Sequence, residues 1–158
     1  MSAKLSPLLR LTLVGLPLAF LVGAAAGLAT ASDSLVFTDV VEQTHEFMGY
    51  EQSIKLTPEQ EAVKKAALGA IPAPCCSDNS AYTCCCPCNM SRAVWGLANH
   101  LIADKGMDAE AVKNKAQEWF EFINPDGFSG DVCYTAGGCN RPFAKNGCGG
   151  MSPNRVIF

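Results

Sequence analysis

Six of the nine cysteines in this chain fall within fifteen consecutive residues, and this clustering constrains the fold more than any other feature. The stretch runs from Pro74 to Cys88 and has the sequence PCCSDNSAYTCCCPC. The other three cysteines, Cys133, Cys139 and Cys148, lie in a glycine-rich segment further along the chain. So many thiols indicate disulfide formation, metal ligation or redox exchange, the three main uses of cysteine chemistry.

Adjacent cysteines are poor disulfide partners for one another. Consecutive Cα atoms lie about 3.8 Å apart, whereas the two Cα atoms of a disulfide normally lie about 4.4 to 6.8 Å apart. Bonds between Cys75 and Cys76, or within the run Cys84, Cys85 and Cys86, would therefore be strained. Because nine is an odd number, at least one cysteine also stays outside any intramolecular disulfide, and the spacing leaves the connectivity open.

Metal ligation is the use that adjacent thiols favour. Thiolates are soft ligands that suit Cu(I), Zn(II) and iron–sulfur clusters. The spacings match neither a zinc ribbon nor a bacterial ferredoxin, and no haem-attachment motif occurs because Asn89 follows Cys88. We therefore expect Cu(I), with Zn(II) as the second choice and no haem. The predicted ligands come from the cysteine stretch and the tail: Cys75, Cys76, Cys84, Cys85, Cys86, Cys88, Cys133, Cys139 and Cys148.

Two other uses of the cysteines stay open. In the first, most of them form disulfides, and the protein is a structural or accessory subunit of a membrane or periplasmic assembly. In the second, the sequence CCPC at 85–88 is the site of a thiol–disulfide oxidoreductase, with Cys85 attacking and Cys88 resolving. A thioredoxin fold is not expected, since no apolar strand precedes this motif and no βαβ pattern follows it. We expect a binding protein rather than an enzyme.

Residues 1–31 have the pattern of an export segment. Lys4 and Arg10 precede an uncharged, apolar run over residues 11–28, which ends in the small residues Ala-Thr-Ala at 29–31. The run is also at the lower limit of length for a membrane-spanning helix, so a cleaved signal peptide and a retained anchor both stay open. In either case residues 32–158 should form a cysteine-rich extracytoplasmic domain, periplasmic or on the outer face of the cytoplasmic membrane.

The net charge of −3 argues against nucleic acid as a partner, because nucleic-acid-binding domains usually present a basic face. The expected partners are a metal ion and, for an accessory subunit, a membrane protein. Contact with the membrane itself should be confined to residues 11–28, if that segment is retained.

The apolar periodicity predicts an all-α domain. Apolar residues recur at helical spacing from residue 37, and Gly49 is expected to end that helix. The sequence TPEQ at 57–60 is a capping box, which predicts the start of a second helix. Two further helices are predicted over residues 90–105, capped by Asn89 or Ser91, and over residues 108–123, capped by Asp108.

The short link between the last two predicted helices indicates an antiparallel hairpin. The open end of such a hairpin would bring the cysteine stretch, which precedes its first helix, beside the glycine-rich segment that follows its second. Thiols that are remote in sequence should therefore become neighbours in space. The glycine density of that segment favours irregular backbone over helix or strand.

The layout resembles the exported bacterial proteins known by a PCYCGC motif, in which a proline-led cysteine cluster precedes helices and later cysteines. The matching residues are PCC at 74–76 and CCCPC at 84–88, and the likeness covers residues 70–150 in outline. The chain departs from the motif, because seven residues separate these two parts and no Cys-Tyr-Cys-Gly-Cys string occurs. The resemblance implies metal binding.

Overall fold

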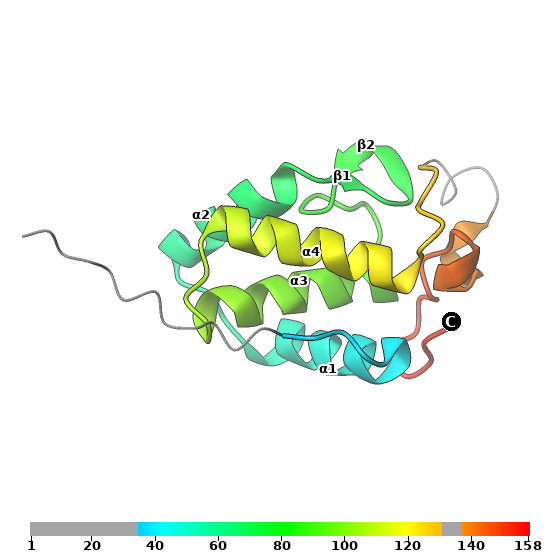
Figure 1. Ribbon diagram of the computed structural model, residues 1–158, viewed down its shortest axis with the longest axis horizontal. Helices are drawn as coiled ribbons and strands as arrows, with labels where there is room; N and C mark the ends of the chain where they lie inside the picture. The colour runs from blue at the N-terminus through cyan, green and yellow to red at the C-terminus, as the bar shows by residue number, and fades with distance from the viewer. Residues whose placement is uncertain (1–34, 131–136) are drawn as a thin grey trace, which may run out of the picture. The chain divides into compact units, whose positions relative to one another are not determined.

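Four α-helices form the framework of the described structure, which covers residues 35–130 and 137–158 of a computed structural model (Figure 1). In chain order the helices are α1 (Val40–Ser53), α2 (Pro58–Gly69), α3 (Asn89–Ala103) and α4 (Ala109–Ile123). Between α2 and α3 lies a two-stranded antiparallel sheet of β1 (Pro72–Ala73) and β2 (Cys76–Ser80). The tail contains two short 3-10 helices, η1 (Gly138–Asn140) and η2 (Phe143–Lys145). The prediction of a mostly helical domain is confirmed.

Two helices begin where their capping residues predict. At the start of α2, the backbone N–H of Gln60 donates to Thr57 Oγ1 (3.3 Å) and that of Thr57 donates to Gln60 Oε1 (3.0 Å). This reciprocal pair completes the capping box. At the start of α4, the N–H of Ala111 donates to Asp108 Oδ1 (2.9 Å). Both caps satisfy backbone donors that have no partner inside the helix.

The first helix extends further than its sequence predicts. Gly49 was expected to end it, but α1 continues through Gly49 to Ser53. An exposed glycine costs a helix only about 1 kcal/mol, which packing can offset. Beyond the glycine, Tyr50 stacks on Phe47 of the same helix and on His100 of α3, with ring centroids 6.2 Å and 4.5 Å apart. These contacts hold the last turn of α1 in place.

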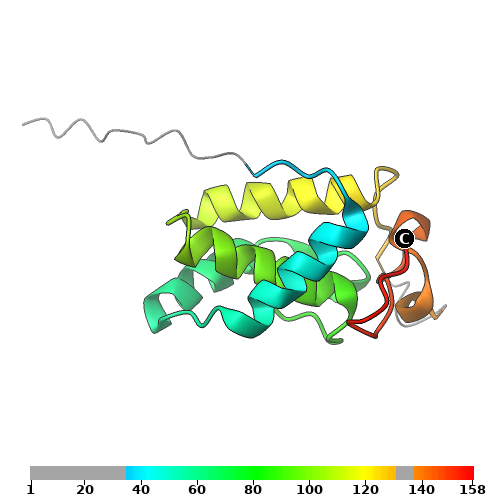
Figure 2. The ribbon, with the colours of Figure 1, turned by 90° about the horizontal axis from the view of Figure 1, so that it is seen from below.

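Helix α3 is the centre of the fold. Its most extensive contact is with α1, and it also packs against α2 and α4. Figures 1 and 2 show α3 and α4 side by side and antiparallel, so the predicted hairpin is present with slightly different ends. The buried face of α4 carries the stripe that the periodicity predicts: Val112, Ala116, Trp119, Phe120 and Ile123.

The small sheet was not anticipated, because no long run of the sequence has strand periodicity. Pro72 and Pro74 favour extended backbone here, and β1 pairs antiparallel with β2 through Ala73 opposite Cys76. The turn between the strands contains Cys75, and Cys76 is the first residue of β2. The sheet therefore separates two adjacent cysteines into a turn and a strand.

Within residues 35–130 and 137–158, no helix has the length and apolar character needed to cross a membrane. The predicted signal or anchor over residues 1–31 lies outside the described residues.

Gly96 allows the close approach of α3 to α1. A Cβ atom at this position would lie 1.8 Å from the carbonyl oxygen of Phe47 and 2.7 Å from the backbone nitrogen of Glu51. Both are backbone atoms of α1, so the contact could be relieved only by moving the two helices apart. No residue larger than glycine fits at position 96 in this arrangement.

We expect Gly96→Ala to lower the free energy of unfolding by about 3 kcal/mol or more, because the added methyl group overpacks the contact between α1 and α3. Urea denaturation followed by circular dichroism would measure the change. Gly49→Ala is the matched control, since a Cβ there meets no atom within 4 Å and should stabilise α1 by roughly 0.5 to 1 kcal/mol. Equal midpoints for the two variants would contradict the described contact.

Candidate thiol site

Four cysteine side chains form a closed ring of contacts, which we call the buried quartet: Cys75, Cys84, Cys88 and Cys148. Cys84 contacts Cys75 and Cys88, and Cys148 contacts the same two residues. Cys75, Cys88 and Cys148 are at most 1% exposed, and Cys84 is half-buried. The quartet joins the cysteine stretch to the tail, so the predicted proximity of remote thiols is confirmed for Cys148.

The quartet lies where the tail closes over the first turn of α3. The N–H groups of the first two residues of this helix donate to tail carbonyls: that of Asn89 to Gly150 (2.9 Å) and that of Met90 to Cys148 (3.2 Å). The N–H of Cys148 in turn donates to the carbonyl of Gly138 (3.0 Å). The carbonyl and the N–H group of Cys148 are thus both hydrogen-bonded, which fixes the backbone that carries its sulfur.

Asn89 is the main tie between the tail and α3. Its side-chain Nδ2 donates to the carbonyls of Gly149 (2.9 Å), Ser152 (3.0 Å) and Arg155 (3.0 Å), and the residue is fully buried. The prediction that Asn89 or Ser91 caps α3 is therefore wrong. Cys88 occupies the N-cap position, and carbonyls of the tail accept from the first helical N–H groups.

Ser91 connects Cys88 to the loop before it. The Ser91 hydroxyl donates to the carbonyls of Cys86 (2.7 Å) and Cys88 (3.0 Å), and its Oγ lies 3.6 Å from Cys88 Sγ. The serine thus fixes both the backbone of the cysteine loop and the position of the Cys88 sulfur. The sequence indicated Ser91 as a polar residue at a helix start, but not this contact with sulfur.

The contacts within the quartet favour one thiolate, at Cys88. Hydrogen bonds from Cys148 and Cys84 lower the pKa of Cys88 well below its usual range, in spite of burial. Contacts with Cys75 and Cys88, together with burial, raise the pKa of both Cys84 and Cys148. At neutral pH, Cys84 and Cys148 therefore keep their protons and share them with the Cys88 thiolate.

A second group of sulfurs lies on the solvent side, and we call it the outer trio: Cys76, Cys85 and Cys86. The sulfurs of Cys85 and Cys86 lie 3.5 Å apart, and Cys85 also contacts Cys76. Cys85 is exposed, Cys86 is half-buried and Cys76 is buried. Neighbours in the sequence are thus divided, because Cys75 and Cys84 belong to the quartet while Cys76 and Cys85 belong to the trio.

Cys85 has the wrong acidity for the attacking thiol of an oxidoreductase. Partial desolvation and the hydrogen bond with Cys86 raise the pKa of Cys85 to about 12, so it stays protonated at neutral pH. The thiolate is the nucleophilic form of cysteine, and the acidic thiol of the CCPC sequence is the buried Cys88. This acidity argues against the proposed redox roles of Cys85 and Cys88.

The remaining predicted ligands fall outside both groups or outside the described residues. Cys139 lies in η1 and is half-buried, and Cys133 is not among the described residues. The cysteines of residues 35–130 and 137–158 form no disulfide with one another. In the same residues, no three side chains of His, Cys, Asp or Glu are arranged to hold a metal ion. The quartet is therefore a set of touching thiols rather than a preformed metal cage.

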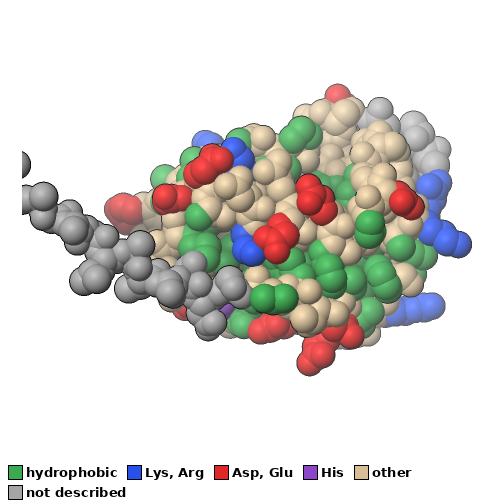
Figure 3. Space-filling model, in the orientation of Figure 1, with side chains coloured by type: hydrophobic (Ala, Val, Ile, Leu, Met, Phe, Trp, Pro, Cys, Tyr) green, Lys and Arg blue, Asp and Glu red, His purple; other side chains and the backbone are tan. Residues whose placement is uncertain are grey.

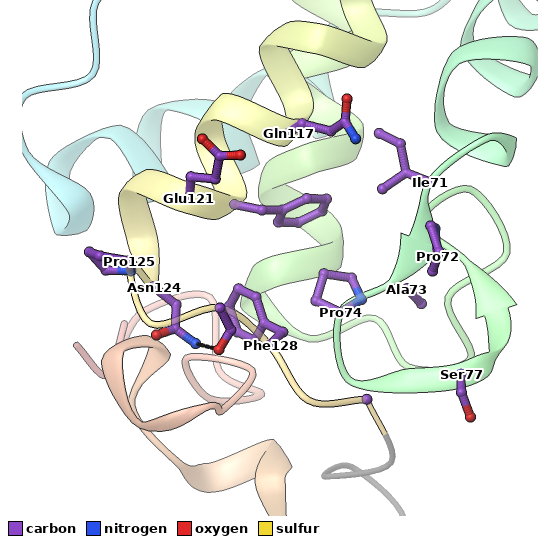
Figure 4. Close-up of a pocket in the computed structure, with 13 residues that line it drawn as sticks. Ile71, Pro72, Ala73, Pro74, Ser77, Gln117, Glu121, Asn124, Pro125 and Phe128 are labelled. Atoms are coloured by element: carbon purple, nitrogen blue, oxygen red, sulfur yellow. Dashed lines mark hydrogen bonds between the residues drawn. The ribbon is translucent and has the colours of Figure 1, made fainter.

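A pocket of about 350 Å³ lies beside the cysteine loop (Figure 4). One wall comes from Ile71, Pro72 and Pro74 near β1, and the other from the end of α4 and the segment after it, including Phe120 and Phe128. No cysteine lines this pocket. Its chemistry is mostly apolar and separate from both thiol groups.

The tail brings positive charge to the thiol end of the fold. Residues 137–158 include Arg141, Lys145 and Arg155 and no acidic residue. Figure 3 shows several Lys and Arg side chains at the end of the visible face where the tail lies, and both basic and acidic side chains elsewhere on that face.

Comparison with protein-family models, curated proteins and solved structures finds no match for this chain. The argument for its function therefore rests on the chemistry and geometry of the thiols.

We expect Asn89→Asp to detach the tail from α3, because a carboxylate would face three carbonyl oxygens without any N–H to offer them. The loss of these bonds should cost about 2 to 5 kcal/mol of unfolding free energy. It should also make Cys148 react faster with iodoacetamide, as followed by peptide mass spectrometry. Asn114→Asp, on the exposed side of α4, is the matched control for the charge change. Equal alkylation of Cys148 in both variants would contradict this role of Asn89.

Proposed function

We propose that this protein is an exported metal-binding protein whose buried quartet holds a soft metal ion through four thiolates. The observation that carries the proposal is the closed ring of contacts between Cys84 and Cys148 on one side and Cys75 and Cys88 on the other. Four sulfurs brought together from three segments of the chain, three of them buried, are a donor set that suits thiophilic ions.

The spacing of touching thiols is compatible with a shared metal ion. With a metal–sulfur distance of about 2.3 Å, the sulfurs of a tetrahedral site lie about 3.8 Å apart, which is close to ordinary sulfur–sulfur contact. The four sulfurs form no preformed metal cage, so they would have to rearrange round a common centre as the ion binds. The lowered pKa of Cys88 favours its sulfur as the first ligand, and the thiols of the quartet would lose their protons to solvent as the ion enters.

The number of sulfurs bears on the identity of the ion. The sequence favours Cu(I) over Zn(II), because adjacent thiolates suit Cu(I) clusters. A set of four sulfurs is instead the donor set of tetrahedral Zn(II) or of iron–sulfur centres. We therefore propose Zn(II) for the buried quartet, with Cu(I) as its competitor at this position.

Export is part of the proposal. Lys4, Arg10 and the apolar run over residues 11–28 support a signal peptide or a membrane anchor, which would place residues 32–158 in the periplasm or on the outer face of the membrane. The limited resemblance to exported PCYCGC-type proteins points the same way. In an oxidising compartment, a bound metal ion would also protect the quartet from disulfide formation.

Disulfides within the quartet are the second candidate, and the same ring of contacts supports them. Cys75 could pair with Cys84 while Cys88 pairs with Cys148, or Cys75 could pair with Cys148 while Cys84 pairs with Cys88. A bond from Cys75 to Cys148 would close a long loop and stabilise the fold by about 4 kcal/mol. The protein would then be a stapled structural or accessory subunit, with a membrane protein as its partner.

We expect the full-length chain, purified without oxygen, to contain about one zinc ion per molecule by plasma mass spectrometry. Cys88→Ser should lose this zinc, since it removes one of the four sulfur ligands, whereas Cys85→Ser in the outer trio should retain it. Chelation should lower the melting temperature of the wild type and of Cys85→Ser, and leave that of Cys88→Ser unchanged. Equal zinc content in the two variants would exclude the quartet as the site.

A thiol titration under denaturing conditions separates the two candidates. The metal-binding protein should show all nine cysteines as reactive thiols once it is unfolded in the presence of a chelator. Each disulfide would lower this number by two. A loss of four thiols, with no zinc detected, would favour the stapled subunit over the metal-binding protein.

A further inference from the structure

We propose that the outer trio of Cys76, Cys85 and Cys86 is a second metal site, which binds Cu(I) at the surface and is distinct from the buried quartet. This inference rests on the proposed function, because it extends thiolate binding to the three sulfurs of the 74–88 stretch that the quartet does not use. The two sites would differ in the number of sulfurs, in access to solvent and in the ion that they select.

The trio supplies the three sulfurs that a three-coordinate ion would need, and they would have to rearrange round it, because no three side chains among the described residues form a preformed metal cage. The sulfurs of Cys85 and Cys86 are 3.5 Å apart, and Cys85 also contacts Cys76. In a trigonal site with metal–sulfur distances near 2.3 Å, the sulfurs lie about 4 Å apart. The neighbouring pair therefore needs only a small opening to admit an ion. Cys85 and Cys86 cannot form an unstrained disulfide in spite of this short distance, because they are adjacent in the chain.

The trio has one sulfur that is open to solvent, although its Cys76 is buried. Cys85 is exposed, whereas Cys88 and Cys148 of the quartet have no exposed surface. An ion at the trio could therefore be delivered and removed by exchange of one thiolate for another, without unfolding of the tail. The donor would be a thiolate-bound Cu(I): as each sulfur of the trio binds the ion, its thiol gives up its proton to the departing donor thiolate or to solvent, and copper stays Cu(I).

Groups around the trio support a fixed set of thiolates. Asn79 Nδ2 donates to Cys76 Sγ (3.2 Å), which is the kind of outer hydrogen bond that orients and stabilises a metal-bound sulfur. Arg92 Nε donates to the carbonyl of Pro87 (2.9 Å), which places a guanidinium group beside the loop.

The coordination number distinguishes the two sites. Zn(II) in proteins is almost always bound by four ligands in structural sites, which the quartet provides and the trio does not. Cu(I) is a soft ion that thiolates select without this demand for four ligands. We therefore assign Zn(II) to the quartet and Cu(I) to the trio. Adjacent cysteines in the sequence predict Cu(I), and in this assignment that ion binds at the exposed part of the cysteine loop.

The test uses the full-length chain, loaded with zinc and titrated with Cu(I) without oxygen against the chromogenic chelator bicinchoninate. The wild type should hold about one Cu(I) that the chelator does not remove, while its zinc stays bound. The double variant Cys85→Ser and Cys86→Ser should lose this copper and keep its zinc, and the retained zinc shows that the variant is folded. Cys88→Ser should instead lose its zinc and keep its copper.

The measured zinc and copper contents distinguish a failure of the trio as the copper site from a failure of the quartet as the zinc site. Tight Cu(I) binding by the zinc-loaded double variant would overturn the trio as the copper site and leave the quartet intact. Displacement of zinc by copper in the wild type, with one ion in total, would also overturn it. If instead the chain binds no zinc but the double variant loses its copper, the quartet assignment fails and the trio stands.

Discussion

The attachment of the tail to the first turn of α3 is the interaction on which the thiol site depends. Asn89 offers its side-chain N–H groups to three carbonyls, and the first helical N–H groups find their acceptors in the same segment. These bonds satisfy donors that every helix start leaves open, so the helix is capped by remote backbone rather than by its own neighbour. One of the accepting residues is Cys148. The bonds that cap α3 therefore also hold the Cys148 sulfur in contact with Cys88.

The division of adjacent cysteines between two groups follows from local backbone geometry. A tight turn before β2 separates Cys75 from Cys76, and the loop that approaches α3 separates Cys84 from Cys85. Neighbouring side chains that point to different sides cannot compete for the same ion or the same disulfide partner. The steric limit on adjacent cysteines therefore produces a buried set and an exposed set from one short stretch of chain.

Much of the helical framework could be predicted from the sequence, because caps are local. Thr57 and Asp108 mark helix starts through residues within one turn, and the short link after α3 implied that Cys148 would approach the cysteine stretch. The rest depends on tertiary contacts that no local pattern encodes. The role of Asn89 requires three carbonyls from more than fifty residues away, and the extension of α1 past Gly49 requires His100 on another helix.

The burial of Cys148 gives the tail a further property. Since this residue is the only described sulfur of the tail within the quartet, the order of the tail is linked to the state of the thiols beneath it. An occupied or oxidised quartet would fasten the final segment to α3, while an empty one would rely on hydrogen bonds alone. Protease cleavage within residues 137–158 would then distinguish chains with an empty quartet from chains whose quartet is occupied or oxidised. The empty chains would be the ones degraded first.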